Sequence, residues 1–265
     1  MNKGLVVIMS SFFIAAGFGG YLVSESRKIP EVNKPEESDV LDTPLPHITG
    51  KEIDYLLQER KIEDKNVIDS LIGIQGRIKS TPNKASISRE QGIMLVTSVL
   101  IDEMEGGFHP KAYDDGSGVL TIGIGSIYIR DRKSDTERRV RAGDKIGKQE
   151  AVNMRNKRIK ENYLFLTKSL PHMVLDKLNV YSIAALNSYI YNIGQSAFLR
   201  SEVYKLLKAK MKVDINLIST LNRSYITASG KTVSGLVKRR KIEAGLLSLS
   251  SKKKDLARYL ALEGL

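Results

Sequence analysis

The sequence predicts a mostly helical α+β domain with one small antiparallel β-hairpin, preceded by an N-terminal transmembrane helix. Three observations support this fold class. Apolar residues recur at helical intervals through most of the chain beyond residue 86. Convincing strand patterns are confined to residues 119–122 and 127–129, and an uncharged run occupies residues 4–23. With 265 residues, the chain has room for one ordinary domain of roughly 100 to 150 residues and its appendages.

The membrane-spanning prediction depends on the run GLVVIMSSFFIAAGFGGYLV at residues 4–23. Its length matches the roughly 20 residues that a helix needs to cross a hydrocarbon core of about 30 Å. Because Gly, Ala and Ser dilute its large apolar residues, we expect residues 1–26 to form a weakly inserting signal-anchor. A cleaved signal peptide, with residues 15–17 as the cleavage region, and a buried globular helix are the alternatives.

Residues 27–85 are expected to form a linker that contains short amphipathic helices. The first part is polar and contains Pro30, Pro35, Pro44 and Pro46, which favours an extended chain. In the second part, apolar residues recur at helical spacing as far as Gly76. The main domain is placed at residues 86–265.

The main domain is expected to open with a capped helix, because Ser88 and Gln91 have capping-box spacing. That helix ends at the Gly106-Gly107 pair. Further helices are predicted at residues 150–170, 180–193, 201–210 and 236–249. The charged segment 130–150 is interpreted as a solvated surface.

The net charge and the absence of cysteine limit the classes of partner and cofactor that we expect. The formal charge of +12 favours a polyanionic partner, such as nucleic acid, anionic lipid or an acidic polymer of the cell envelope. No nucleic acid is expected, because the sequence lacks the aromatic-basic interleaving of nucleic-acid-binding motifs. The absence of cysteine excludes disulfides and thiolate metal sites. Neither a metal nor a cofactor is expected.

Two carboxylates in residues 103–126 are in contrasting environments. Glu105 lies in the last turn of the first helix of the main domain, where the partial negative charge of the helix end favours the protonated carboxyl. Asp115 begins an Asp-Gly-x-Gly turn, whose backbone N–H groups favour the ionised form. An acid and base pair is therefore one interpretation, and Thr121 on the following strand has a hydroxyl that can hold a water. Solvated surface charge is the alternative.

Three further motifs follow Glu105-Gly106 in order along the sequence. They are YDDGSGVLTIGIG at 113–125, ALNSYIYNIGQSAF at 185–198 and SGLVKRRKIEAGLL at 234–247, with a fourth block at 141–151. Together they resemble the phage-type lysozymes. The resemblance implies a two-lobed lysozyme-like domain, with a β-hairpin lobe and a helical lobe. It also implies a muramidase that cuts the β-1,4 bond from N-acetylmuramic acid to N-acetylglucosamine in peptidoglycan, and thereby lyses bacterial cells.

By this resemblance Glu105 is the general acid, Asp115 the base or electrostatic partner, and Thr121 the residue that positions water. Substrate contacts are expected from Tyr113 at the floor of the cleft, from Asn192, and from Arg239, whose guanidinium suits a glycan or peptide carboxylate. Structural capping by Asn192 stays open. So does an ion-pair role for one of the adjacent Arg239 and Arg240.

Two departures from the family pattern stand out. Ser126 occupies the position where the family usually has a His, and the interval from Glu105 to Tyr113 is one residue longer than usual. Glu103 is therefore an alternative acid, although residues two apart on a helix do not share a face. Asp114 is an alternative to Asp115, which keeps the family spacing to Thr121.

The N-terminal segment also resembles that of signal-anchor-release endolysins. This resemblance implies a monomer at the host cell inner membrane, facing the periplasm and held through residues 4–23 until it is released. A membrane-anchored peptidoglycan-binding protein with an inactive lysozyme fold is the alternative from another functional class. A virion-associated muralytic enzyme is a third.

Overall fold

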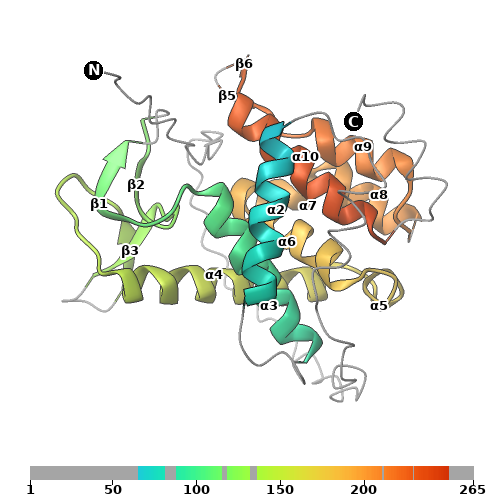
Figure 1. Cartoon of the computed structure of the whole chain (residues 1–265), viewed down its shortest axis with the longest axis horizontal. Helices are drawn as coiled ribbons and strands as arrows, with labels where there is room; N and C mark the ends of the chain where they lie inside the picture. The colour runs from blue at the N-terminus through green and yellow to red at the C-terminus, as the bar shows by residue number, and fades with distance from the viewer. Residues whose placement is uncertain are drawn as a thin grey trace, which may run out of the picture.

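The structure is a computed structural model that describes residues 65–80, 88–114, 118–131, 136–210, 212–228 and 230–250. Figure 1 shows the strands β1 to β3 at one end and most of the helices at the other. The long helix α4 (Lys148–Ser169) extends from beside the strands to the helical part. The predicted mostly helical fold with two lobes is therefore confirmed.

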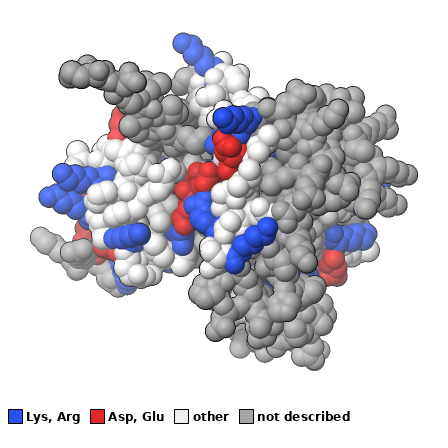
Figure 2. Space-filling model, viewed as in Figure 1, with Lys and Arg blue, Asp and Glu red and all other residues white. Residues whose placement is uncertain are grey.

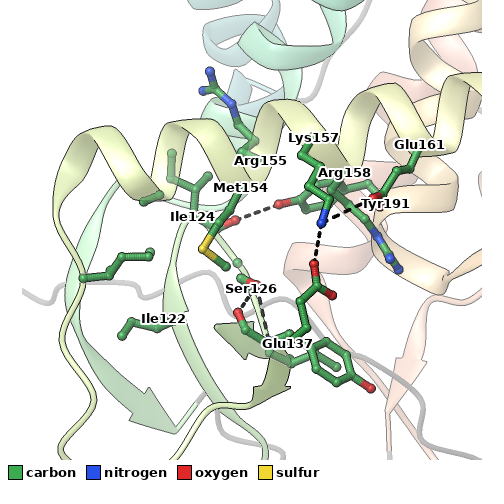
Figure 3. Close-up of a pocket in the computed structure, with 16 residues that line it drawn as sticks. Ile122, Ile124, Ser126, Glu137, Met154, Arg155, Lys157, Arg158, Glu161 and Tyr191 are labelled. Carbon is green, nitrogen blue, oxygen red and sulfur yellow. Dashed lines mark hydrogen bonds and ion pairs between the residues drawn. The ribbon is translucent and has the colours of Figure 1, made fainter. Parts of the chain in front are cut away.

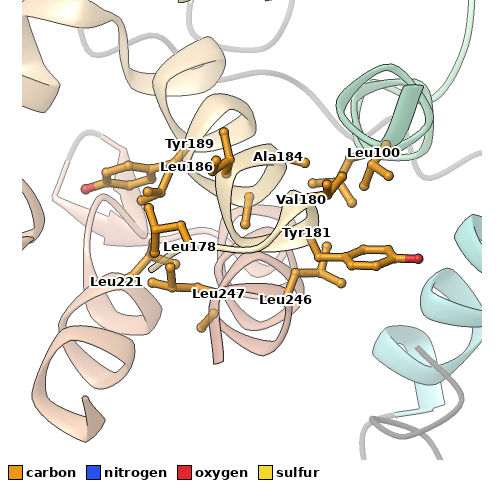
Figure 4. Packing of buried hydrophobic residues seen from close by; sticks show 14 of the residues in the cluster. Leu100, Leu178, Val180, Tyr181, Ala184, Leu186, Tyr189, Leu221, Leu246 and Leu247 are labelled. Atoms are coloured by element: carbon orange, nitrogen blue, oxygen red, sulfur yellow. The ribbon is translucent and has the colours of Figure 1, made fainter. Parts of the chain in front are cut away.

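The helical lobe is built around α6 (Val180–Ile193), whose buried residues run without a break from Val180 to Asn192. It packs against α3 (Arg89–Met104) and α10 (Ser234–Ser248), so apolar side chains surround it on several sides (Figure 4). The lobe is completed by α5 (His172–Leu175), α7 (Gln195–Arg200), α8 (Glu202–Lys210) and α9 (Ile215–Arg223).

The helix α3 begins and ends as its sequence predicts. The Ser88 side chain accepts a hydrogen bond from the Gln91 N–H, and the Gln91 side chain accepts one from the Ser88 N–H. This reciprocal pair satisfies two of the otherwise unpaired donors at the helix start. At the other end Glu105 is the C-cap, and Gly106 and Gly107 follow with φ of +70° and +100°. The chain can therefore turn sharply into the β lobe.

The β lobe differs from the single predicted hairpin. Strand β1 (His109–Asp114) pairs antiparallel with β2 (Leu120–Gly123), and β3 (Tyr128–Arg130) pairs antiparallel with β4 (Glu137–Arg139). The structure thus differs from one hairpin built on the strands expected at 119–122 and 127–129, because β2 pairs with β1 and β3 with β4. An isolated antiparallel bridge from Ile122 to Ser126 lies between β2 and β3. A short third pair, β5 (Thr227–Ala228) with β6 (Lys231–Thr232), precedes α10.

The helix α2 (Lys65–Ser80) lies in the predicted linker but packs against the main domain. Its neighbours are α3 and α10. It contributes Val67, Leu71, Ile74 and Ile78 to the same buried cluster as the centre of the helical lobe. It also extends beyond the predicted end at Gly76. The burial of a full helical face indicates that α2 belongs to the hydrophobic core.

The charged segment 130–150 contributes more than solvated surface. Its strand β4 pairs with β3, and the Ala112 N–H donates to the Asp144 carbonyl at 3.0 Å. Arg138 makes two parallel hydrogen bonds of 2.8 Å to the carboxylate of Asp144, which lowers the pKa of Asp144 to about 2. These bonds fix the segment against the outer edge of β1.

None of the helices in the described part of the chain is long and apolar enough to cross a membrane. The transmembrane helix predicted at residues 4–23 falls outside that part.

Candidate active site

The side chain of Glu105 lies between the two lobes, where α3 ends. Glu105 is only 1% exposed. Its Oε1 accepts a hydrogen bond of 2.8 Å from Nη1 of Arg239, which is 3% exposed and comes from α10. A carboxylate and a guanidinium that are both removed from water interact much more strongly than a surface pair. Glu105 is thus buried beside a cation that the pattern around residue 105 did not indicate.

The remaining donors of Arg239 are also used inside the protein. Its Nε donates to Glu243 at 3.1 Å, and its Nη2 donates to the Ser188 carbonyl at 3.1 Å. Burial opposes its charge, but the carboxylates of Glu105 and Glu243 raise the pKa of Arg239 above its ordinary value. Arg239 therefore stays cationic in this buried position and fixes the orientation of Glu105.

A second arginine completes this buried network. Arg240 is bound to Glu243 and to Oδ1 of Asn192, and its guanidinium lies 4.6 Å from the ring centroid of Tyr189. Burial lowers the pKa of Arg240. Two carboxyl groups thus face two guanidinium groups in one buried network. Buried ions need such compensation.

The second carboxylate oxygen of Glu105 faces a tight turn. No hydrogen bond to Oε2 is present within the described residues. The turn is the stretch 123–126, where the Ile122 N–H donates to Ser126 O at 2.8 Å and the Ser126 N–H donates back at 3.0 Å. A Cβ on Gly125 would lie 2.3 Å from Oε2, and Gly125 has φ of +71°. Only glycine fits here without displacing the carboxylate.

Two of the hairpin residues predicted for the site lie on paired strands, Tyr113 on β1 and Thr121 on β2. Thr121 is fully buried on β2, opposite Tyr113 on β1. The Tyr113 ring packs against His109, with their centroids 4.4 Å apart. Asp114 accepts a hydrogen bond from the Gly118 N–H at 3.0 Å. Asp115 lies outside the described residues.

Ser126 stabilises its own loop. Its hydroxyl donates to the Tyr128 carbonyl at 2.6 Å and accepts a hydrogen bond from the Tyr128 N–H at 3.3 Å. Ser126 therefore fixes the path from the turn into β3.

Glu103 is directed at another part of the molecule. Its carboxylate forms an ion pair with Arg77 on α2, and its side chain is 26% exposed. Glu105, in contrast, is bound by Arg239 on α10. The two carboxylates therefore face different neighbours, as their spacing along the helix predicts. This placement favours Glu105 over Glu103 as the residue of the candidate site.

A cavity of about 260 Å³ adjoins this arrangement (Figure 3). It lies between the 123–126 turn and α4, and its lining includes Gly125 and Tyr191. At its edge Lys157 donates to Glu137 at 2.7 Å. The apolar part of the wall comes from Ile122, Ile124, Ile127, Ile146 and Met154.

The sequence prediction placed Asn192 and Arg239 at the substrate, and the structure places both in the buried network. Asn192 is 1% exposed and binds Arg240, and Nε, Nη1 and Nη2 of Arg239 all donate to acceptors of the protein. Glu243 and Tyr191 were not singled out from the sequence. Glu243 does lie four residues after Arg239, and this spacing on a helix is a usable signal for an ion pair.

The model of the phage lysozyme family matches residues 103–243, which is more than half of the chain. The chain belongs to the phage lysozyme family. The matched region begins just before Glu105 and ends at Glu243, so it contains the network described above. The helix α2 precedes the part that matches the phage lysozyme family.

Individual relatives and solved structures are similar over parts of the chain. The chain is 33% identical over 106 residues to the endolysin of Salmonella phage P22, an alignment that covers 40% of this chain and 66% of that relative. Among solved structures, the endolysin from Escherichia coli O157:H7 phage FAHEc1 has 26% identity and a TM-score of 0.45, covering 59% of this chain and 90% of that one. The active form of the P1 phage endolysin Lyz has 18% identity and a TM-score of 0.45, covering 71% and 96%.

Proposed function

We propose that the protein is an endolysin-type muramidase that hydrolyses the β-1,4 bond between N-acetylmuramic acid and N-acetylglucosamine in peptidoglycan. The observation that carries this proposal is the buried Glu105, oriented by Arg239 at the junction of the two lobes. Membership of the phage lysozyme family supports the same reaction. The relative from phage P22 is named an endolysin, which agrees with a role in lysis.

In the proposed reaction Glu105 donates a proton to the oxygen of the leaving sugar while water attacks the anomeric carbon. Since Oε1 accepts from Arg239, Oε2 is the oxygen that would hold the proton. Asp115 is proposed as the base or electrostatic partner across the cleft, and Thr121 as the residue that positions the water. An inverting enzyme needs its two carboxyl groups roughly 6.5 to 9.5 Å apart, which leaves space for that water.

Tyr113 is proposed to contact the substrate at the hairpin. We propose that Asn192 and Arg239 act on the reaction indirectly, because they form hydrogen bonds with other residues inside the protein. On the face shown in Figure 2, Lys and Arg side chains are scattered over the described surface, with acidic side chains among them. This pattern does not favour a nucleic-acid groove on that face.

The reaction can be tested on purified peptidoglycan by mass spectrometry of the products. Hydrolysis should release fragments with muramic acid at the reducing end, and Glu105→Gln should release none. Anhydro-muramic ends would indicate a transglycosylase instead. If the parent protein binds peptidoglycan without releasing any fragment, the chain is a binding protein with an inactive fold.

We further propose that residues 4–23 hold the monomeric protein at the host cell inner membrane, facing the periplasm, until it is released. The Gly-, Ala- and Ser-rich composition of this segment supports weak insertion. Cells that express the chain should be fractionated before and after collapse of the membrane potential. The protein should move from the membrane to the soluble fraction, whereas complete retention in the membrane under both conditions would contradict release.

A further inference from the structure

Tyr191 connects the helical lobe to the turn that faces Glu105. It lies near the end of α6 and is 5% exposed. Its hydroxyl donates a hydrogen bond of 2.8 Å to the carbonyl of Ile124, the residue just before Gly125 (Figure 3). A buried hydrogen bond of this kind is expensive to break, because it would leave the Ile124 carbonyl without a partner.

The turn at residues 123–126 has close neighbours on two sides. A Cβ on Gly123 would lie 3.0 Å from Cβ of Ala151 on α4, and a Cβ on Gly125 would lie 2.3 Å from Oε2 of Glu105. Both glycines have positive φ. The Gly123 end of the turn is therefore packed against Ala151, and a movement of its Gly125 end changes the space around the carboxylate.

The Glu105 carboxylate is held from two directions. Arg239 binds Oε1, and the backbone of Gly125 limits where Oε2 can lie. Arg239 is itself fixed by Glu243 and Ser188. The position of Oε2 thus depends on the turn, and the turn depends on the hydroxyl of Tyr191.

We propose that Tyr191 is a positioning residue for the reaction, which sets the location of the general acid Glu105 through the Ile124–Gly125 backbone. This inference rests on the proposed muramidase function. Tyr191 suits the task at neutral pH, because burial and the nearby Glu105 raise its pKa and the hydroxyl keeps its proton for Ile124. Phenylalanine would fill the same space but could not hold the carbonyl.

The test compares Tyr191→Phe with Tyr163→Phe in the full chain. Tyr163 is a matched control, since it is 4% exposed and packs in the helical-lobe cluster through α4. Both variants remove the hydroxyl of a mostly buried tyrosine, but only the first loses a contact with the turn. We expect kcat on peptidoglycan to fall roughly 10-fold in Tyr191→Phe with KM changed less than about twofold, since small misplacements of a catalytic group slow the reaction strongly. Tyr163→Phe should keep the parent kcat.

A second measurement does not depend on activity. The Ser126 N–H, which bonds to Ile122 O, reports on opening of the turn by hydrogen exchange. Its exchange should quicken at least about tenfold in Tyr191→Phe and stay unchanged in Tyr163→Phe. Unchanged exchange would show that the hydrogen bond from Tyr191 does not hold the turn in place. Faster exchange with an unaltered or increased kcat would refute positioning of the acid. An inactive parent would instead refute the proposed function. The exchange data would still decide whether Tyr191 holds the 123–126 turn in place.

Discussion

Arg239 on α10 donates from Nη1 to Oε1 of Glu105 at 2.8 Å, although 134 residues separate them in the sequence. Both side chains are almost fully buried. The pair joins the end of α3 to the helix at the other end of the domain. It explains how a carboxylate can be buried between the lobes.

Replacing Arg239 with Met should destabilise the protein strongly. Glu105 and Glu243 would lose their shared cation, and removal of one partner from a buried pair usually costs about 3 to 5 kcal/mol. Urea unfolding followed by circular dichroism measures the change. Lys238→Met, a neighbouring and half-buried position on the same helix, is the control and should change the free energy of unfolding by less than about 1 kcal/mol. Equal effects of the two variants would argue against the ion pair.

Gly125→Ala should abolish most activity, whereas Gly143→Ala should not. Both glycines have positive φ, so both variants carry a similar backbone penalty of about 1 to 2 kcal/mol. Only at Gly125 would the new Cβ collide with Glu105, because no heavy atom of the described residues lies within 4 Å of a Cβ at Gly143. The displaced carboxylate would lose its alignment, and we expect turnover to fall about 100-fold. Similar turnover in both variants would contradict the close approach of Gly125 to the acid.

Asp144→Asn should reveal a pH-dependent contribution to stability. Arg138 and the Arg141 N–H hold the pKa of Asp144 at about 2, below its ordinary value of 3.8. A lowered pKa stabilises the fold above the unfolded-state pKa, and this contribution is lost as the pH falls toward 2. Urea midpoints should therefore show a larger advantage of the parent over the variant at pH 6 than at pH 3. An advantage that grows at pH 3 would contradict the assignment.

Leu71→Ala should test whether α2 belongs to the core. Leu71 is 1% exposed and its neighbour Ile72 is 51% exposed. Truncation of a buried leucine typically costs about 2 to 5 kcal/mol, whereas an exposed site changes stability by about 0.5 kcal/mol or less. Thermal and urea unfolding of Leu71→Ala and Ile72→Ala measure the difference. A helix that is only part of a linker would give two small, similar values.

The helices could be predicted from the sequence better than the strands. The helix at residues 180–193 and the Ser88 capping box follow from periodicity and local hydrogen-bonding chemistry, and the structure confirms both. Strand β1, with the sequence HPKAYD, contains a proline and has no alternation of apolar residues. Its pairing with β2 comes from the tertiary fold, so a local pattern could not identify it.

The candidate site could be predicted only in part for the same reason. Glu105 was identified because a carboxylate at a helix end next to a glycine turn is a local feature. The partners of Glu105 come from α10 and from the 123–126 turn, and nothing in the local sequence specifies those contacts. For Arg239 the sequence leaves both a substrate contact and an ion-pair role open, because its protein partners depend on how α10 packs against α6.

The most direct test of the central claim compares the turnover of Glu105→Gln with that of Glu103→Gln on purified peptidoglycan. Both changes remove one carboxylate from neighbouring positions and keep the side-chain shape. If Glu105 is the general acid, its variant should lose at least about 100-fold in turnover, whereas the Glu103 variant, which lacks only an ion-pair partner of Arg77, should stay within about twofold of the parent. Full activity in Glu105→Gln, or the larger loss in Glu103→Gln, would contradict the account.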